Sequence, residues 1–166
     1  MFALKALSHD SVAGALAKAE HYRLLNEPAE AESICRDVLE IEPGNQQALV
    51  CEILALSDQF PQDRNAFTRA CKLVEQLHSP YDRAYYEGIL WERRAKARHH
   101  EGGHGSRHTV YEWILKALQH FATAETLRPT GNDNALLRWN TCVRFLQRHT
   151  EVTPRAEEAV EPILSE

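Results

Sequence analysis

Residues 22–45 read YRLLNEPAEAESICRDVLEIEPGN, a stretch that contains two turns with a helix-sized segment between them. Asn26-Glu27-Pro28 predicts the first turn, because Pro28 suits the first turn of the helix that follows it. Pro43-Gly44-Asn45 predicts the second turn, where Asn45 can cap the next helix. Helices joined by turns this short pack antiparallel to their neighbours, so the stretch predicts a helical hairpin.

The same pattern of helices and turns continues in both directions from this stretch. Apolar residues recur at helical spacing, Pro, Gly and Asn interrupt them, and no segment alternates in the way of a half-buried strand. The predicted helices cover about residues 11–25, 28–42, 46–57, 61–77, 80–99, 106–127 and 134–148. We therefore predict an all-α fold, either a globular bundle or a stacked solenoid, and a repeat would decide between them.

The first hairpin resembles one unit of the tetratricopeptide repeat family, a pair of helices of about 34 residues. Ala19 and Ala31 stand where the family has small residues, and Pro43 stands at the proline that ends the second helix of a unit. Small residues at these places let two helices approach closely. Cys35 departs from the family pattern, in which a large aromatic residue is usual.

A second match to the family occurs late in the chain, in the stretch ALQHFATAETLRP. Its matching residues, spaced by 4, 3 and 5, are Ala117, Phe121, Ala124 and Pro129. Gly88 fits the small position of the preceding first helix. The family spacing would then place the first of these matches at residue 100, so this unit carries an insertion of 17 residues.

The resemblance implies an α-α superhelix, a right-handed solenoid of about three helix pairs with a C-terminal capping helix. Its units are about 12–45, 46–78 (a weaker copy) and 81–130 with the insertion, and the capping helix is 133–148. Residues 149–166 form a tail, either a short helix that folds back into the protein's own groove or a frayed acidic end.

The resemblance also implies a function, because the first helices of such repeats line a concave groove that binds a peptide or helix of another protein. The positions carried over are Leu16, Glu20, Arg23, Gln47, Val50, Leu54, Ser57, Asp82, Tyr85, Ile89 and Glu92. We therefore expect a non-enzymatic adaptor or scaffold, and three units leave enough uncovered surface for a homodimer. The alternative is that some of these side chains pack against the final helix or the tail, since an apolar stripe on a helix is usually core.

A histidine-rich stretch, RHHEGGHGSRH at residues 98–108, falls inside the insertion. Its candidate ligands are His99, His100, Glu101, His104 and His108, a set suited to zinc, nickel or copper. They support a second hypothesis, a metal-binding or metal-responsive protein. The interspersed glycines break the helical spacing, and basic neighbours repel a cation. The stretch is interpreted first as a mobile basic loop, then as a partner contact, and third as a chelator.

Composition, charge and the absence of certain motifs bear on the class of protein, its partners and its location. The net charge of −5 argues against nucleic acid as a partner, and no apolar run approaches the roughly 20 residues of a membrane span. We expect a cytoplasmic protein. No Gly-rich phosphate loop, G-x-S-x-G elbow or closely spaced cysteine pair occurs, so we expect neither an enzyme nor a cofactor.

Overall fold

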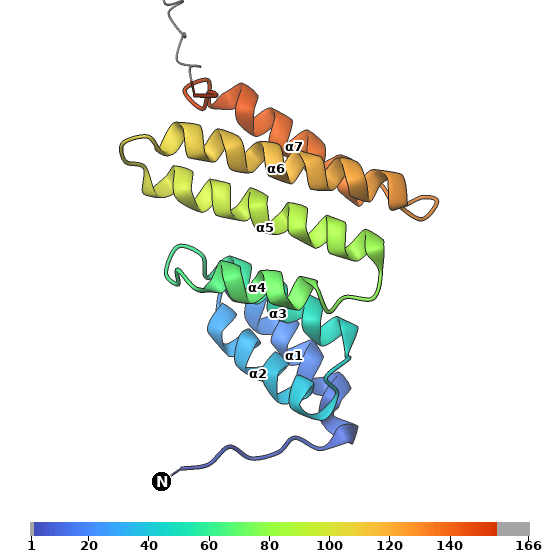
Figure 1. Ribbon diagram of the computed structural model, residues 1–166. Coiled ribbons are helices and arrows are strands. Elements are labelled where there is room, and N and C mark those ends of the chain that lie inside the picture. The colour runs from blue at the N-terminus through green and yellow to red at the C-terminus, as the bar shows by residue number, and fades with distance from the viewer. Residues whose placement is uncertain (1, 156–166) are drawn as a thin grey trace, which may run out of the picture.

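The computed structural model describes residues 2–155, and over that range the chain is helical with turns between the helices (Figure 1). A short 3-10 turn, His9–Ser11, precedes the first helix. The helices are α1 (Val12–Leu24), α2 (Pro28–Ile41), α3 (Gln46–Asp58), α4 (Ala66–Val74), α5 (Pro80–Glu101), α6 (Ser106–Leu127) and α7 (Asn134–Arg148). The predicted all-α class is confirmed for these residues.

Two helix starts follow from local side-chain chemistry. The Asn45 side chain accepts a hydrogen bond of 2.9 Å from the backbone N–H of Ala48, which caps α3. The Ser79 hydroxyl accepts one of 3.2 Å from the N–H of Asp82, and Pro80 occupies the first position of α5. Each cap satisfies an N–H that the first turn of a helix leaves unpaired.

The prediction for the fourth helix was wrong at its N-terminal end, because α4 begins at Ala66 and residues 61–65 form a turn. Asp63 explains the difference, since its carboxylate accepts a hydrogen bond of 2.8 Å from the N–H of Asn65. The same carboxylate pairs with Arg69 at 2.6 Å. A carboxylate that bonds the backbone two residues on stabilises a turn in competition with a helix.

The helices are stacked in chain order (Figure 1). Each helix packs against the next one along the chain, and each odd-numbered helix also contacts the following odd-numbered helix. The helices α1, α3, α5 and α7 therefore form one continuous layer. This layer carries most of the residues that the sequence placed in a groove.

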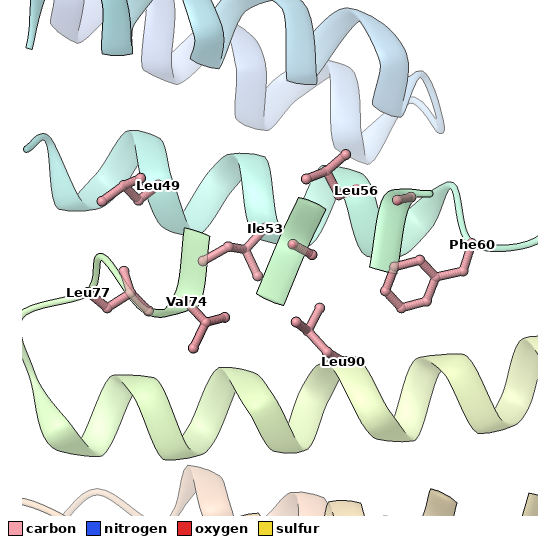
Figure 2. Close-up of a cluster of buried hydrophobic side chains, with 9 residues drawn as sticks. Leu49, Ile53, Leu56, Phe60, Val74, Leu77 and Leu90 are labelled. Carbon is pink, nitrogen blue, oxygen red and sulfur yellow. The ribbon is translucent and has the colours of Figure 1, made fainter. Parts of the chain in front are cut away.

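The largest apolar clusters join neighbouring members of the stack. Figure 2 shows one of them, in which side chains of α3 face those of α4 and Leu90 of α5. Its labelled members are Leu49, Ile53, Leu56, Phe60, Val74, Leu77 and Leu90. A second cluster, which includes Ile114, Phe121 and Cys142, joins α5, α6 and α7. The core thus runs along the stack from one helix pair to the next.

The predicted insertion lengthens a helical hairpin. Both α5 and α6 have 22 residues, against 13 in α1, and a short turn containing Gly102, Gly103 and Gly105 joins them. These glycines have φ angles of 69°, 98° and 72°, a left-handed region that suits glycine. At about 1.5 Å per residue, the hairpin is longer than α1 by roughly 13 Å. Among the described residues, even these long helices lack a segment apolar enough to cross a membrane.

Gly88 lies where α5 packs tightly against α6. A Cβ atom added there would lie 2.5 Å from Cε1 of Phe121, whose ring is buried. The two residues come from the two helices of the late repeat match. Only a residue without a side chain fits at this crossing.

We expect Gly88→Ala to lower the free energy of unfolding by about 1–3 kcal/mol, because the phenyl ring must move within a packed core. Gly14→Ala is the matched control, since nothing lies within 4 Å of its added Cβ. That change in α1 should stabilise by about 0.5–1 kcal/mol through helix propensity. Urea unfolding of both variants measures the difference, and equal effects would contradict this view of the crossing.

Glu52 is a buried carboxylate within α3, 6% exposed. Burial raises its pKa above the ordinary value, and Arg36, whose Nε lies 3.9 Å away, only partly offsets that effect. A pKa that is higher in the folded than in the unfolded chain means that ionised Glu52 opposes folding. The cost is present at neutral pH and disappears as the pH falls below the unfolded-state pKa.

We therefore expect Glu52→Gln to be more stable than the natural chain at pH 7.5 and to lose this advantage near pH 4. Urea unfolding at the two pH values measures it. Glu30→Gln, at an exposed position of α2, controls for the change in net charge. An advantage of Glu52→Gln that is the same at both pH values would contradict burial as its cause.

Candidate functional site: the face of the odd-numbered helices

A hollow of about 290 Å³ lies between α1 and α3 on the face formed by the odd-numbered helices. Five of the predicted groove residues line it: Glu20, Arg23, Gln47, Val50 and Leu54. Leu24 and Cys51 complete the lining. The structure therefore brings together the exposed and half-buried part of the predicted set from the first two units.

The lining combines an apolar floor with a polar edge. Val50 and Leu54 are half-buried, and Leu24 is 86% exposed at the end of α1. At the edge, the Gln47 side-chain amide donates a hydrogen bond of 3.1 Å to the Glu20 carboxylate, which ties α3 to α1. A large exposed apolar side chain beside a half-buried apolar floor is typical of a contact surface.

A chain of ion pairs continues from this hollow across the face. Asp58, at the end of α3, accepts a hydrogen bond of 2.9 Å from Arg23 of α1 and also pairs with Arg93 of α5. Arg93 donates a further hydrogen bond of 2.6 Å to the Ser57 hydroxyl. Burial lowers the pKa of Arg93, and the charge of Asp58 opposes that effect. Three helices are thus connected through one carboxylate.

Asp58 and Arg93 were missed in the sequence, although a signal was present. Asp58 follows Leu54 by four residues and Arg93 follows Ile89 by four, so each continues a stripe that the predicted set already contained. The repeat pattern includes only the usual groove positions, and Asp58 and Arg93 each lie one residue beyond the last of them, Ser57 and Glu92.

The prediction was wrong for two of the four groove residues on α5, Ile89 and Glu92, because other helices cover them. Ile89 is 3% exposed and packs in the α5–α6–α7 cluster. Glu92 is fully buried, between Lys96 at 2.5 Å and Arg138 of α7 at 3.1 Å. The helix α7 thus covers this part of the face.

Two predicted residues in the first units are buried as well. Leu16 is 3% exposed and packs with Val12 and Val38, so it belongs to the core. Ser57 is 4% exposed and acts through its bond to Arg93. Neither side chain offers a partner more than a small fraction of its surface.

Asp82 and Tyr85 remain half-exposed on α5. The Tyr85 ring stacks on that of Tyr81, with centroids 5.7 Å apart, and also contacts Phe121. The neighbouring Tyr86, absent from the predicted set, has a pKa raised to about 12, first by burial and then by the charge of Asp82. The aromatic residues at this end of α5 therefore hold the stack together and expose only an edge.

The predicted histidine ligands do not gather at one point. His99, His100 and Glu101 form the last turn of α5, His104 lies in the connecting turn, and His108 lies on α6. Each of three has another neighbour: Glu101 pairs with Arg98 at 3.4 Å, His108 contacts the Thr153 carbonyl at 3.0 Å, and His99 stacks edge-on against His149. The five-residue chelating set is thus separated in space.

A larger hollow, about 510 Å³, lies elsewhere, between the 60–65 turn and the last turns of α5. One of its charged groups, Arg94, is already engaged, because the guanidinium lies 3.9 Å from the Phe67 ring centroid and 4.3 Å from that of Trp113. A cation held between two rings of its own chain is a stabilising contact. Size alone therefore does not make this hollow the better candidate.

Comparison with known proteins adds no relative: no family model, no curated protein and no solved structure matches this chain.

The buried pair of Glu92 and Arg138 should carry a large cost when it is broken on one side. We expect Glu92→Ala to lower the free energy of unfolding by about 3 kcal/mol, because the buried Nε of Arg138 then loses its counter-charge and so does Lys96. The double variant Glu92→Leu with Arg138→Leu should recover most of this loss, since apolar residues of similar volume replace both charges and Lys96, 38% exposed, can turn its ammonium toward water. Urea unfolding tests this, and a double variant as unstable as Glu92→Ala would contradict the pairing.

Proposed function

We propose that the chain is a helical-repeat protein of the tetratricopeptide type, a superhelix of three helix pairs and a capping helix. Two features support this. Each odd-numbered helix contacts the next odd-numbered one, as the first helices of stacked units would. The small residues of both repeat matches, Ala19, Ala31, Ala117 and Ala124, are completely buried where the helices pack.

We further propose that it acts as a non-enzymatic adaptor that binds a peptide or helix of another protein on the face of the odd-numbered helices. The observation that carries this proposal is the hollow between α1 and α3, with its apolar floor and polar edge. Its volume of about 290 Å³ is at the lower limit for small-molecule sites. It suits one or two side chains of a partner that extends along the face.

The charges on the face indicate the chemistry of the partner. Among residues 2–155, the ion pairs of these four cations involve two carboxylates, Asp58 and Glu92; the cations are Arg23, Arg93, Lys96 and Arg138. The hollow offers contacts for an apolar side chain through Val50, Leu54 and Leu24. A segment that carries an apolar side chain followed by an acidic one complements both features.

A second copy of the chain is the alternative occupant of this face. Leu24 and Leu25, 86% and 53% exposed at the end of α1, would gain most from such a contact. Size-exclusion chromatography with light scattering distinguishes a dimer from a monomer that binds a foreign peptide. The peptide experiment below is to be run at concentrations where the chain is monomeric.

The proposal is tested with a random peptide library selected on the immobilised chain, followed by measurement of Kd by fluorescence anisotropy. The double variant Leu24→Glu with Gln47→Glu places two negative charges at the hollow on exposed side chains, and circular dichroism checks that loss of the Gln47–Glu20 hydrogen bond leaves the helices folded. We expect it to weaken the selected peptides at least tenfold, which is about 1.4 kcal/mol.

The control is Leu115→Glu with Leu137→Glu, which makes the same charge change at two exposed leucines outside the hollow. It should leave Kd within about twofold. Equal binding to both double variants would reject the hollow as the site, and so would a library that yields no saturable binder.

A further inference from the structure

Three side chains of the kind that bind metal ions meet where the chain leaves α7 and returns to the end of α5. They are His99 on the last turns of α5, His149 directly after α7, and Glu151 two residues later. One ligand atom from each lies within 4.8 Å of the other two. His149 Nδ1 lies 3.3 Å and His99 Nε2 lies 3.9 Å from the same Glu151 oxygen.

We propose that His99, His149 and Glu151 form a binding site for a divalent transition-metal ion, with zinc as the best match. Two imidazoles and one carboxylate are a common set of zinc ligands, at about 2.0–2.2 Å from the ion. Tetrahedral bonds of that length place neighbouring ligand atoms roughly 3.4 Å apart. The separations of 3.3 Å and 3.9 Å differ from this value by about 0.5 Å or less, and the remaining one, at most 4.8 Å, by no more than about 1.4 Å, so side-chain rotations can bring the three atoms to an ion.

The two imidazoles are held in place by packing. Both rings lie against Phe145, with centroids 5.3 Å from His99 and 4.6 Å from His149, and the two rings are themselves 4.4 Å apart. Side chains whose orientation is supported by neighbours lose less freedom when they bind an ion. This support is what the glycine-rich turn with His104 does not offer.

The backbone that carries Glu151 is also fixed. The N–H of Val152 donates a hydrogen bond of 2.9 Å to the carbonyl of His149, and the Val152 side chain is buried in the α5–α6–α7 cluster. Thr153 then contacts His108 of α6 through its carbonyl. Glu151 therefore stands on an anchored turn between two residues that contact the helical stack.

Two cationic side chains near the cluster are already paired with carboxylates, and the cluster is open to solvent. Lys96, one turn before His99, is paired with Glu92, and Arg98 is paired with Glu101. His99 and His149 have side chains 29% exposed and Glu151 is 56% exposed, so the site can be reached from solvent. Three protein ligands leave a fourth position for water or for a group of another molecule.

The experiment is titration of the metal-free full chain with zinc chloride by calorimetry, together with cobalt(II) chloride, whose visible absorption reports the ligand geometry. We expect one ion per chain. His99→Ala and His149→Ala should each weaken binding at least tenfold and abolish the cobalt absorption, because each removes a nitrogen ligand. Glu151→Gln should weaken binding less, because its amide oxygen remains a poorer donor.

The matched controls are His100→Ala and His104→Ala, which remove exposed histidines from the same region outside the cluster. They should bind zinc like the natural chain. Circular dichroism without metal checks the fold of each variant; if His149→Ala is unfolded, His99→Ala and Glu151→Gln decide the question. Failure to bind zinc, or loss of binding in the controls with retention in His99→Ala, overturns the proposal.

Discussion

The close contact of α5 with α6 at Gly88 and Phe121 is the constraint on which the rest of the structure depends. Because Gly88 has no side chain, the phenyl ring of Phe121 can fill the space between the axes of α5 and α6. The completely buried Ala19 and Ala31 show that small residues also occupy the contact of α1 with α2. Because each hairpin is fixed by such a contact, the odd-numbered helices are held in one layer, and their polar side chains can meet.

The packing of the odd-numbered helices in one layer explains why some of their charged side chains are partly buried. Asp58 joins α1 and α5 through Arg23 and Arg93, and Glu92 joins α5 to Arg138 of α7. Such pairs add little net stability, since the loss of hydration offsets much of the attraction. They do oppose sliding of one helix along another, because a shift of one turn would separate the charges by about 5 Å. Their role here is to fix the position of each odd-numbered helix along the next one.

Local patterns were sufficient for the helices except the start of α4, and for five of the eleven residues placed on the shared face, which line one hollow. The caps at Asn45 and Ser79 and the small residues of both repeat matches act within one hairpin, where spacing determines contact. Ile89 and Glu92 were misplaced because their burial depends on α7, which arrives from about 50 residues further along the chain. The cluster of His99, His149 and Glu151 could not be predicted for the same reason. His99 lies in the histidine-rich stretch, but its two neighbours follow α7.

α7 approaches both proposed sites, since Arg138 pairs with Glu92 on the face of the odd-numbered helices and His149 directly follows the last residue of the helix. Arg138 meets the face of the odd-numbered helices, and His149 lies 11 residues further on, about 16 Å along the helix axis. Coupling between them would need an element with two alternative arrangements. The helix is instead held near both ends, by Ala135 and Cys142, which are completely buried, and by the anchored turn at Val152. An ion at His99, His149 and Glu151 should therefore stabilise the long hairpin against α7 and leave peptide affinity at the α1–α3 hollow unchanged.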